Sequence, residues 1–216
     1  MTDFAALRDA MVDRQIAARG LNAPGLLAAF RAIPREAFVS SYHAHDAYRD
    51  SPLPIESGQT ISQPYIVAVT IDAAEIGPGD KVLEVGAGSG YAAAVIGRIA
   101  HEVVAIERHH DLAVLARERM ERLGYHNVRI VEGDGTLGCP EEAPFDAIVA
   151  AASGSHVPDS LLDQLKPGGR IVMPVGHPNG IQHLVKITKG ADGGLVTEDL
   201  GGVRFVPLIG KEGFRD

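Results

Sequence analysis

The order of apolar and polar residues predicts helices in the first part of the chain. Four apolar residues near the start approximate the spacing of one helical face: Phe4, Leu7, Met11 and Ile16. A second helix is expected to begin at Asn22 or Pro24 and to end at Pro34. Its apolar face contains Leu26, Leu27 and Phe30. The chain is therefore expected to begin with a helical extension.

A long loop and a third helix follow this extension. Residues 40–61 have no sustained period and are interrupted by prolines and glycine, which predicts a long ordered loop. Such loops are often functional. Residues 62–64, SQP, are typical of a helix start, because proline is favoured in the first helical turn. The third helix is expected to continue to about Ala74 and to end before the glycines of residues 77–79.

From Lys81 onward, short runs rich in valine and isoleucine alternate with helical patterns. The predicted strands are residues 81–85, 103–106, 128–131, 145–150 and 170–174. The predicted helices between them are residues 90–100, 110–123 and 158–165. This alternation predicts right-handed crossovers and a mostly parallel sheet with both faces covered. Beyond Gly180, residues 183–188 and 203–208 are predicted to be strands, and the glycines of 190–194 indicate a hairpin that adds an antiparallel element.

The most informative segment is residues 82–91, VLEVGAGSGY, where a predicted strand runs into three alternating glycines. Glycines at such a turn let a ligand approach the backbone at the N-terminus of the next helix. A dinucleotide-binding loop needs a small residue at its last position, which Tyr91 occupies here. Glu84, just before the first glycine, would repel a phosphate but favour an ammonium group. The segment therefore favours a cofactor with an adenosine end and an amino-acid end.

Two further acidic residues follow predicted strands. Glu107 lies about 20 residues beyond the glycine loop, where a carboxylate can accept hydrogen bonds from ribose hydroxyls. Asp134 follows the third strand, and the adenine amino group is its expected partner. Because open α/β sheets bind ligands beyond the carboxyl ends of their strands, Glu84, Glu107 and Asp134 are expected at one edge. The alternative is that these acids are solvated loop caps.

Composition narrows the possible functions. The 216 residues are 45% apolar and 22% charged with a net charge of −8, which disfavours nonspecific nucleic-acid binding. The sequence predicts no membrane span and no signal peptide. The single cysteine, Cys139, excludes an intramolecular disulfide and favours a cytoplasmic location. No metal is expected, because His109 and His110 have no matching ligand pair. The expected oligomeric state is a monomer.

Five segments carry a pattern that extends over nearly the whole chain. They are residues 58–65 (GQTISQPY), 82–91, 132–135 (EGDG), 165–176 (LKPGGRIVMPVG) and 203–208 (VRFVPL). Together they resemble the protein-L-isoaspartate O-methyltransferase family. The glycine loop and the KPGG stretch resemble many methyltransferases, whereas the first and last segments look particular to this family. The chain departs from the family at residues 150–156, AAASGSH, and at Ile209, where some relatives have threonine.

The resemblance implies a three-layer α/β/α Rossmann-like methyltransferase fold. Its sheet is mostly parallel and seven-stranded with one antiparallel strand. Residues 1–79 would form a helical extension with the substrate and cofactor loop, and residues 80–216 the cofactor-binding core, within one integrated domain. The implied cofactor is S-adenosylmethionine, and the implied substrates are proteins and peptides that contain L-isoaspartyl residues.

The resemblance also assigns site residues. The family's active-site serine falls on Ser62. Its cofactor contacts fall on Thr60, Ile61, Ser62, Gly86, Gly88, Glu107, Arg108, Asp134 and Gly135. Glu84 is added to the expected cofactor contacts, because its carboxylate would favour the ammonium group of the cofactor. The expected substrate contacts are Ser62, Val206, Pro207 and Leu208.

The chemistry of the implied acceptor sets the role of Ser62. An isoaspartyl carboxylate with a pKa of about 4 is ionised at neutral pH, so it can attack a sulfonium methyl group in line without a strong general base. Proximity and alignment then supply most of the catalysis, about 7–11 kcal/mol in favourable cases. Ser62 is expected to donate a hydrogen bond to the substrate carboxylate. The alternative is that it caps the helix near Pro64.

Three functions remain open from the sequence. The first is repair, in which the methyl ester of isoaspartate closes to a succinimide that can reopen to aspartate. The second is a small-molecule O-methyltransferase on the same scaffold, which a narrow closed pocket would favour, whereas an open groove near Ser62 would favour repair. The third is a non-catalytic cofactor-binding module, against which Ser62, Glu107 and Asp134 argue.

Overall fold

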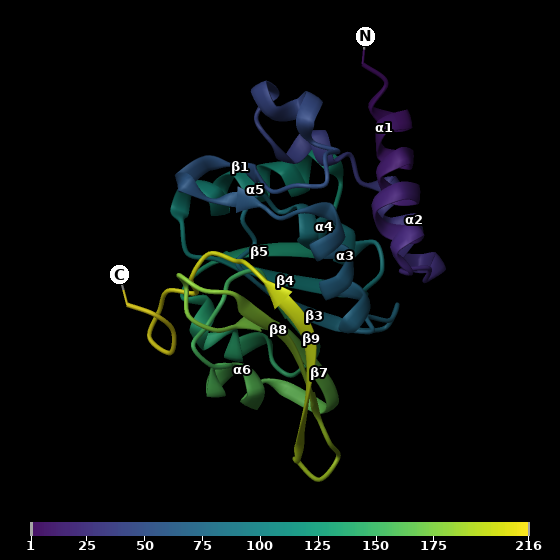
Figure 1. Ribbon diagram of the computed structural model, residues 1–216. Helices are drawn as coiled ribbons and strands as arrows, with labels where there is room; N and C mark the ends of the chain where they lie inside the picture. The colour runs from purple at the N-terminus through teal and green to yellow at the C-terminus, as the bar shows by residue number, and fades with distance from the viewer. Residues whose placement is uncertain (1, 216) are drawn as a thin grey trace.

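A computed structural model describes residues 2–215, and a seven-stranded sheet forms its centre (Figure 1). The strands are β3 (Lys81–Val85), β4 (Glu102–Glu107), β5 (Val128–Glu132), β6 (Phe145–Ala150), β7 (Leu165–Val175), β8 (Gln182–Lys189) and β9 (Leu195–Val203). Their spatial order is β5-β4-β3-β6-β7-β8-β9. Neighbours from β5 to β7 are parallel, and β8 is antiparallel to both β7 and β9. The predicted mostly parallel sheet with one antiparallel strand is therefore confirmed.

The strand order creates a switch point between β3 and β6. From β3 the chain forms β4 and then β5 on one side, and it later returns to form β6 on the other side of β3. Connections that leave in opposite directions open a crevice beyond the carboxyl ends of the strands. The glycine-rich segment follows β3, so the topology places it at this crevice.

Helices cover both faces of the sheet. Successive side chains of a strand point to opposite faces, so the buried strands place apolar side chains on both. On β3, Val82 belongs to one hydrophobic cluster, and Leu83 and Val85 belong to the other. The first cluster includes residues of α3 (Pro64–Ala73), α4 (Tyr91–Gly97) and α5 (His110–Leu123). The second includes Leu161 of α6 (Asp159–Asp163). These layers confirm the predicted α/β/α arrangement.

The N-terminal helices extend the first of these layers. In Figure 1, α1 (Phe4–Met11) and α2 (Pro24–Ala32) stand beside α3 and α4, and α2 contacts both. The predicted apolar stripes are largely buried, including Met11, Ile16 and Phe30, although Leu7 is 38% exposed. One hydrophobic cluster contains residues of both the extension and the sheet. The division at residues 79 and 80 stays a prediction.

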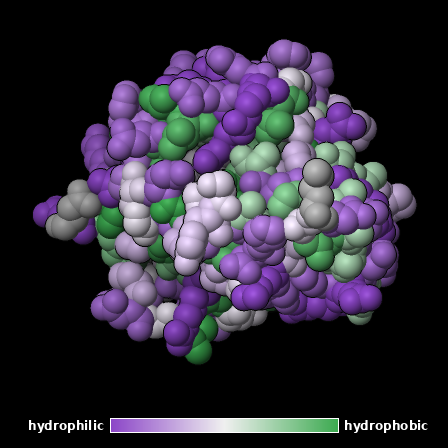
Figure 2. Space-filling view, turned by 90° about the horizontal axis from the view of Figure 1, so that it is seen from above, coloured by the Kyte–Doolittle hydropathy of each residue, from purple (hydrophilic) through white to green (hydrophobic). Residues whose placement is uncertain are grey.

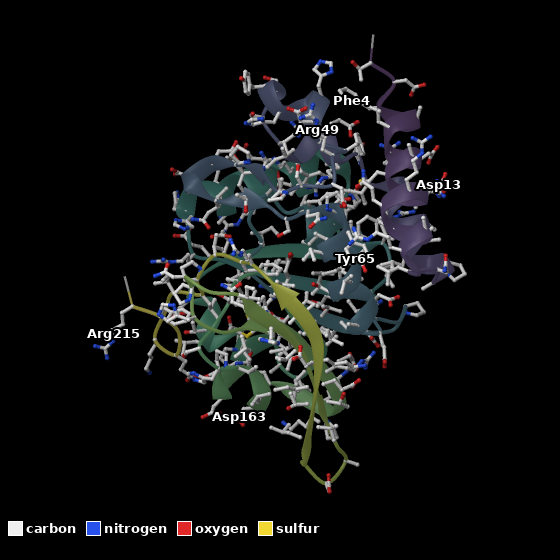
Figure 3. The ribbon with its side chains drawn as sticks, viewed as in Figure 1. Phe4, Asp13, Arg49, Tyr65, Asp163 and Arg215 are labelled. Carbon is white, nitrogen blue, oxygen red and sulfur yellow. The ribbon has the colours of Figure 1, made fainter. Side chains whose placement is uncertain are left out.

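Aromatic contacts attach the extension to the helix that follows the glycine loop. Tyr91, the first residue of α4, is 1% exposed, and its ring centre lies 6.2 Å from that of Phe30 and 5.6 Å from that of Phe38. Figure 3 labels Tyr65 on α3, whose ring centre lies 3.2 Å from the guanidinium carbon of Arg19. The bulky residue that breaks the dinucleotide pattern is thus accommodated by the extension.

The sequence predicts a strand over residues 203–208, and this prediction is wrong. The last strand of the described residues is β9, Leu195–Val203, and residues 204–208 are irregular apart from a bridge between Pro207 and Ser153. The glycine turn explains the difference, because the Gly190 amide donates to the Gly194 carbonyl at 2.7 Å and pairing with β8 starts directly after it. The apolar residues of 203–208 instead cover the sheet edge, where Leu208 is 5% exposed. The predicted helices 90–100 and 158–165 are shorter than expected.

The surface mixes side chains of both kinds. On the face seen from above in Figure 2, green hydrophobic groups are separated by purple hydrophilic ones. The large hydrophobic side chains with the greatest exposure are Tyr42, Ile181 and Val196, at 85%, 65% and 63%. Within residues 2–215, no helix has the length and apolar character needed to cross a membrane.

We predict that Tyr91→Ala lowers the free energy of unfolding by about 3–5 kcal/mol, because it removes a buried ring and leaves a cavity. Tyr91→Phe keeps the ring packing and removes a buried hydroxyl that has no hydrogen-bond partner, so it is expected to change the free energy of unfolding by less than about 1 kcal/mol. Urea unfolding measures both values. A loss for Tyr91→Phe as large as that for Tyr91→Ala would contradict the role of ring packing in attaching the extension.

Candidate active site

A cavity of about 420 Å³ opens at the carboxyl ends of β3 and β6. Five segments supply most of its lining: residues 58–62, 84–89, 106–109, 149–152 and 205–209. The predicted site residues that line it are Thr60, Ile61, Ser62, Glu84, Gly86, Gly88, Glu107, Arg108, Gly135, Val206, Pro207 and Leu208. Asp134 is not among its lining residues. The fold therefore gathers residues that are far apart in the sequence at the switch point.

Glu107 holds the glycine loop in place. Its carboxylate accepts hydrogen bonds from the Gly88 amide at 2.8 Å and from the His109 amide at 2.9 Å. Gly88 has a φ of 53°, a conformation that glycine adopts without strain. Each carboxylate oxygen can accept a second hydrogen bond. Glu107, which is 5% exposed, can therefore order the loop and still receive two hydroxyl donors from a ligand.

Glu84 is a buried carboxyl that faces the cavity without a full set of partners. It is 2% exposed, and its Oε2 has no hydrogen-bond partner, while the Ala93 amide of α4 supplies a hydrogen bond to the carboxylate. Burial, and then the charge of Glu107, raise the pKa of Glu84 well above its usual range. A cation placed in the cavity would favour the ionised form. This orphaned oxygen is what a ligand ammonium group would satisfy.

Ser62 lies in a short connection between β2 (Thr60–Ile61) and α3, on the wall of the same cavity. β2 pairs with β1 (Leu53–Pro54), which fixes the loop before Ser62. The cap of α3 is Gln63, without a side-chain hydrogen bond, so the helix-cap alternative for Ser62 is wrong. In the part of the chain that the structure describes, the Ser62 hydroxyl has no side-chain or backbone partner. It is available to donate to a ligand.

Asp134 anchors the C-terminal segment. Its Oδ1 accepts from the Thr136 amide and hydroxyl at 2.9 and 2.7 Å, and its Oδ2 accepts from the Lys211 amide at 2.8 Å. Partial burial raises the pKa of Asp134, but these hydrogen bonds outweigh it and hold the pKa below its usual value. The adjoining Gly135 and Ile209 line the cavity. The adenine role of Asp134 stays a prediction that this geometry does not favour.

A second hollow joins the cavity beside Ser62. It is lined by residues 202–206 together with Pro52, Thr60, Ser62, Gln63, Ile66, Ala151 and Ile181. Thr60, Ser62 and Val206 belong to both spaces. The site is thus a cavity continuous with a groove along the end of β9, and Ser62 lies where the two meet.

Two buried arginines behind the site are missed by the sequence reasoning. Arg119 of α5 is 8% exposed and donates to the Ser89 carbonyl in the glycine loop at 3.2 Å. Its spacing from Ala116 on the apolar face of α5 could have revealed it. Arg35 is fully buried and donates to the Ser62 carbonyl at 2.7 Å. No periodic pattern marks Arg35, because it lies in a single short turn. Among the described residues, no His, Cys, Asp or Glu cluster could hold a metal.

The architecture and the site together define a class. A switch-point cavity with a glycine loop, a carboxylate for ribose hydroxyls and an unsatisfied carboxyl for an ammonium group fits the methyltransferases that use S-adenosylmethionine. The profile of the protein-L-isoaspartate(D-aspartate) O-methyltransferase family matches residues 6–213. The chain therefore belongs to this family, and S-adenosylmethionine is its cofactor.

Individual relatives agree with this assignment. Protein-L-isoaspartate O-methyltransferase 2 of Pelobacter propionicus is 53% identical over 96% of this chain and 92% of its own length. Protein-L-isoaspartate O-methyltransferase 1 of Rhodopseudomonas palustris is 54% identical over 99% of this chain and 87% of its own.

Solved structures agree as well. A protein-L-isoaspartate O-methyltransferase aligns with a TM-score of 0.85 and 31% identity over 97% of this chain and 67% of its own. A structure described as this enzyme from Plasmodium falciparum, in complex with S-adenosyl-L-homocysteine, has a TM-score of 0.79 and 25% identity over 94% of this chain and 98% of its own.

The buried carboxyl of Glu84 gives a prediction for the protein without ligand. A carboxyl whose pKa is raised on folding stabilises the fold fully below the unfolded value of about 4.3 and loses that contribution as the pH rises toward the raised value. Between about pH 5 and 8, the unfolding free energy of Glu84→Gln should therefore increase relative to that of the wild type. Chemical unfolding at several pH values measures this difference. A difference independent of pH would contradict the assignment.

Proposed function

We propose that this chain transfers the methyl group of S-adenosylmethionine to the carboxylate of L-isoaspartyl residues in damaged proteins and peptides. The ester would then close to a succinimide and allow repair to aspartate. The observation that carries the proposal is the position of Ser62, whose free hydroxyl lies where the cofactor cavity meets the groove. The family assignment over residues 6–213 supports the same reaction.

The cavity residues fit the two ends of the cofactor. Glu107 would accept hydrogen bonds from the ribose hydroxyls, and Glu84 would pair with the ammonium group. Gly86, Gly88 and Gly135 would allow close approach of the backbone, and Thr60, Ile61 and Arg108 would form the remaining wall. When bound, S-adenosylmethionine supplies an electrophilic methyl group on a positively charged sulfur.

The protein's own part in the reaction is to align the acceptor. An isoaspartyl carboxylate is ionised at neutral pH, so no residue of the chain has to remove a proton. Ser62 would donate a hydrogen bond from its hydroxyl to one carboxylate oxygen and leave the other oxygen free to react. Holding the acceptor in this way supplies the proximity on which the rate depends.

The groove favours a polypeptide acceptor. Val206, Pro207 and Leu208 line the cavity together with the 58–62 segment, and an extended peptide could bind along them through main-chain hydrogen bonds. A narrow closed pocket would favour a small-molecule acceptor, whereas here a second hollow, lined in part by Ile181, adjoins the cavity at Ser62. A non-catalytic binding module would have no need of the free Ser62 hydroxyl at this junction.

Three further expectations belong to this proposal. The enzyme is proposed to act as a monomer, to be located in the cytoplasm and to bind no nucleic acid. The net charge of −8 supports the last of these, and the single cysteine supports the second. Each stays a prediction.

We expect the purified protein to transfer labelled methyl groups from S-adenosylmethionine to an isoaspartyl peptide and not to the matched aspartyl peptide. Counting base-labile label in each peptide measures the reaction. Protein that is folded and binds S-adenosylhomocysteine but leaves the isoaspartyl peptide unlabelled would contradict the proposed function.

We predict that Glu107→Ala weakens S-adenosylhomocysteine binding by at least about 30-fold, because it removes two ligand hydrogen bonds and releases the glycine loop. Ser62→Ala should weaken it by no more than about 3-fold, since its hydroxyl serves the acceptor. Isothermal titration calorimetry measures both. Glu102→Ala, at the opposite end of β4, is the matched control and should bind normally. The reverse order for Glu107 and Ser62 would overturn these roles.

A further inference from the structure

Arg35 is a fully buried cation with an unusual set of partners. It begins the short turn Arg35–Phe38 after α2 and is 0% exposed. Its Nε donates to the Ala47 carbonyl and its Nη2 to the Ser62 carbonyl, each at 2.7 Å. Within residues 2–215 it takes part in no ion pair, so its charge is compensated by two backbone carbonyl dipoles and the face of the Tyr91 ring, and its Nη1 has no hydrogen-bond partner.

The two carbonyls that Arg35 binds lie at the ends of the active-site loop. Ala47 follows the turn Ser41–Asp46, and Ser62 precedes α3. Between them the chain makes the β1–β2 pair and the Thr60–Ile61 wall of the cavity. One planar guanidinium therefore closes this loop at its base, and both of its bonds have a fixed relative geometry.

Arg35 also contacts the glycine-loop side of the site. Its guanidinium carbon lies 4.7 Å from the ring centre of Tyr91, the first residue of α4. The Gly86–Gly90 turn ends immediately before Tyr91. The same side chain thus touches the residue that presents the acceptor hydroxyl and the helix that begins at the cofactor loop.

Stability alone is a poor explanation of this arrangement. Burial lowers the pKa of Arg35, which means that its charged form is disfavoured where it lies. Burying a charge costs free energy that its hydrogen bonds must offset. A rigid fork that fixes the Ser62 carbonyl has a different use, because misplacement of an aligned group by about 1 Å can lower a rate by about 100-fold.

We propose that Arg35 is a positioning residue for Ser62: its guanidinium fixes the Ser62 carbonyl, and thereby the direction of the Ser62 hydroxyl, relative to the cofactor loop. This inference rests on the proposed function of the same site. Arg35 does not itself line the cavity, and it acts on the acceptor only through Ser62.

The test compares Arg35→Lys, Arg35→Gln, Ser62→Ala and the double variant Arg35→Lys/Ser62→Ala in the full chain. Leu26→Ala is the matched control, because it removes a buried side chain from the same extension cluster without touching Ser62. The readouts are kcat and KM for an isoaspartyl peptide, the affinity for S-adenosylhomocysteine, and the melting temperature. A Lys or Gln at position 35 can keep at most part of the fork geometry.

Arg35→Lys is expected to lower kcat about 10- to 100-fold, with KM and S-adenosylhomocysteine affinity changed by no more than about 3-fold. Leu26→Ala, assayed below its melting temperature, should keep kcat within about 3-fold. Adding Arg35→Lys to Ser62→Ala should lower kcat by no more than about 3-fold further, because residues that act through one another are not additive. Full additivity, or an unchanged kcat in Arg35→Lys, would overturn the inference.

A second measurement separates this inference from the proposed function and needs no activity. Hydrogen exchange should become faster in residues 48–63 of Arg35→Lys or Arg35→Gln, whichever folds, and stay unchanged there in Leu26→Ala. If exchange rises as expected in a protein whose wild type methylates no isoaspartyl peptide, the proposed function fails and the loop-holding role of Arg35 survives. Unchanged exchange in residues 48–63 would sink the role of Arg35 whatever the activity.

Discussion

Two carboxyl groups buried at the ends of neighbouring parallel strands are the constraint on which the site depends. Glu84 and Glu107 are 2% and 5% exposed, and both face the cavity at the switch point. Glu107 is partly satisfied by two loop amides, whereas one oxygen of Glu84 has no partner. A buried unsatisfied carboxyl is unfavourable unless a ligand completes it. A cofactor with hydroxyl donors at one end and an ammonium group at the other satisfies both residues.

The rest of the molecule arranges the acceptor against that cofactor. The strand order opens the crevice, and the loop that contains Ser62 lines the cavity there. Tyr91 and Arg35 join the extension to the glycine-loop side through ring packing and a cation–π contact. The extension is therefore part of the site, because it determines where Ser62 lies. The groove beside Ser62, which Ile181 helps to line, supports the proposal of a polypeptide acceptor.

Local sequence patterns predicted those parts of the fold and of the site that depend on short-range interactions. The glycine alternation, the strand-end acids and the apolar runs of β3 to β6 are short-range signals, and the sheet, the cofactor class and the gathering of Glu84 and Glu107 followed from them. Ser62 was assigned by the resemblance to the family. The strand at 203–208 failed because apolar residues that cover a sheet edge have the same composition as a strand. The adenine role expected of Asp134 stays a prediction. Local sequence could not show that its carboxylate accepts from the Lys211 amide, because Lys211 lies 77 positions further along the chain. Arg35 was missed for the same reason, since its two carbonyl partners are defined only by the folded loop.

The most direct test of the central claim is whether Glu84 recognises the amino-acid end of the cofactor. Wild type and Glu84→Gln are titrated by calorimetry with S-adenosylhomocysteine and with 5′-methylthioadenosine, which lacks that end. The comparison separates recognition of the amino-acid end from a general effect on the cavity. The account predicts that Glu84→Gln weakens S-adenosylhomocysteine by at least about 10-fold and leaves 5′-methylthioadenosine within about 2-fold. An equal loss for both ligands would contradict it, because Glu84 would then act on the cavity as a whole.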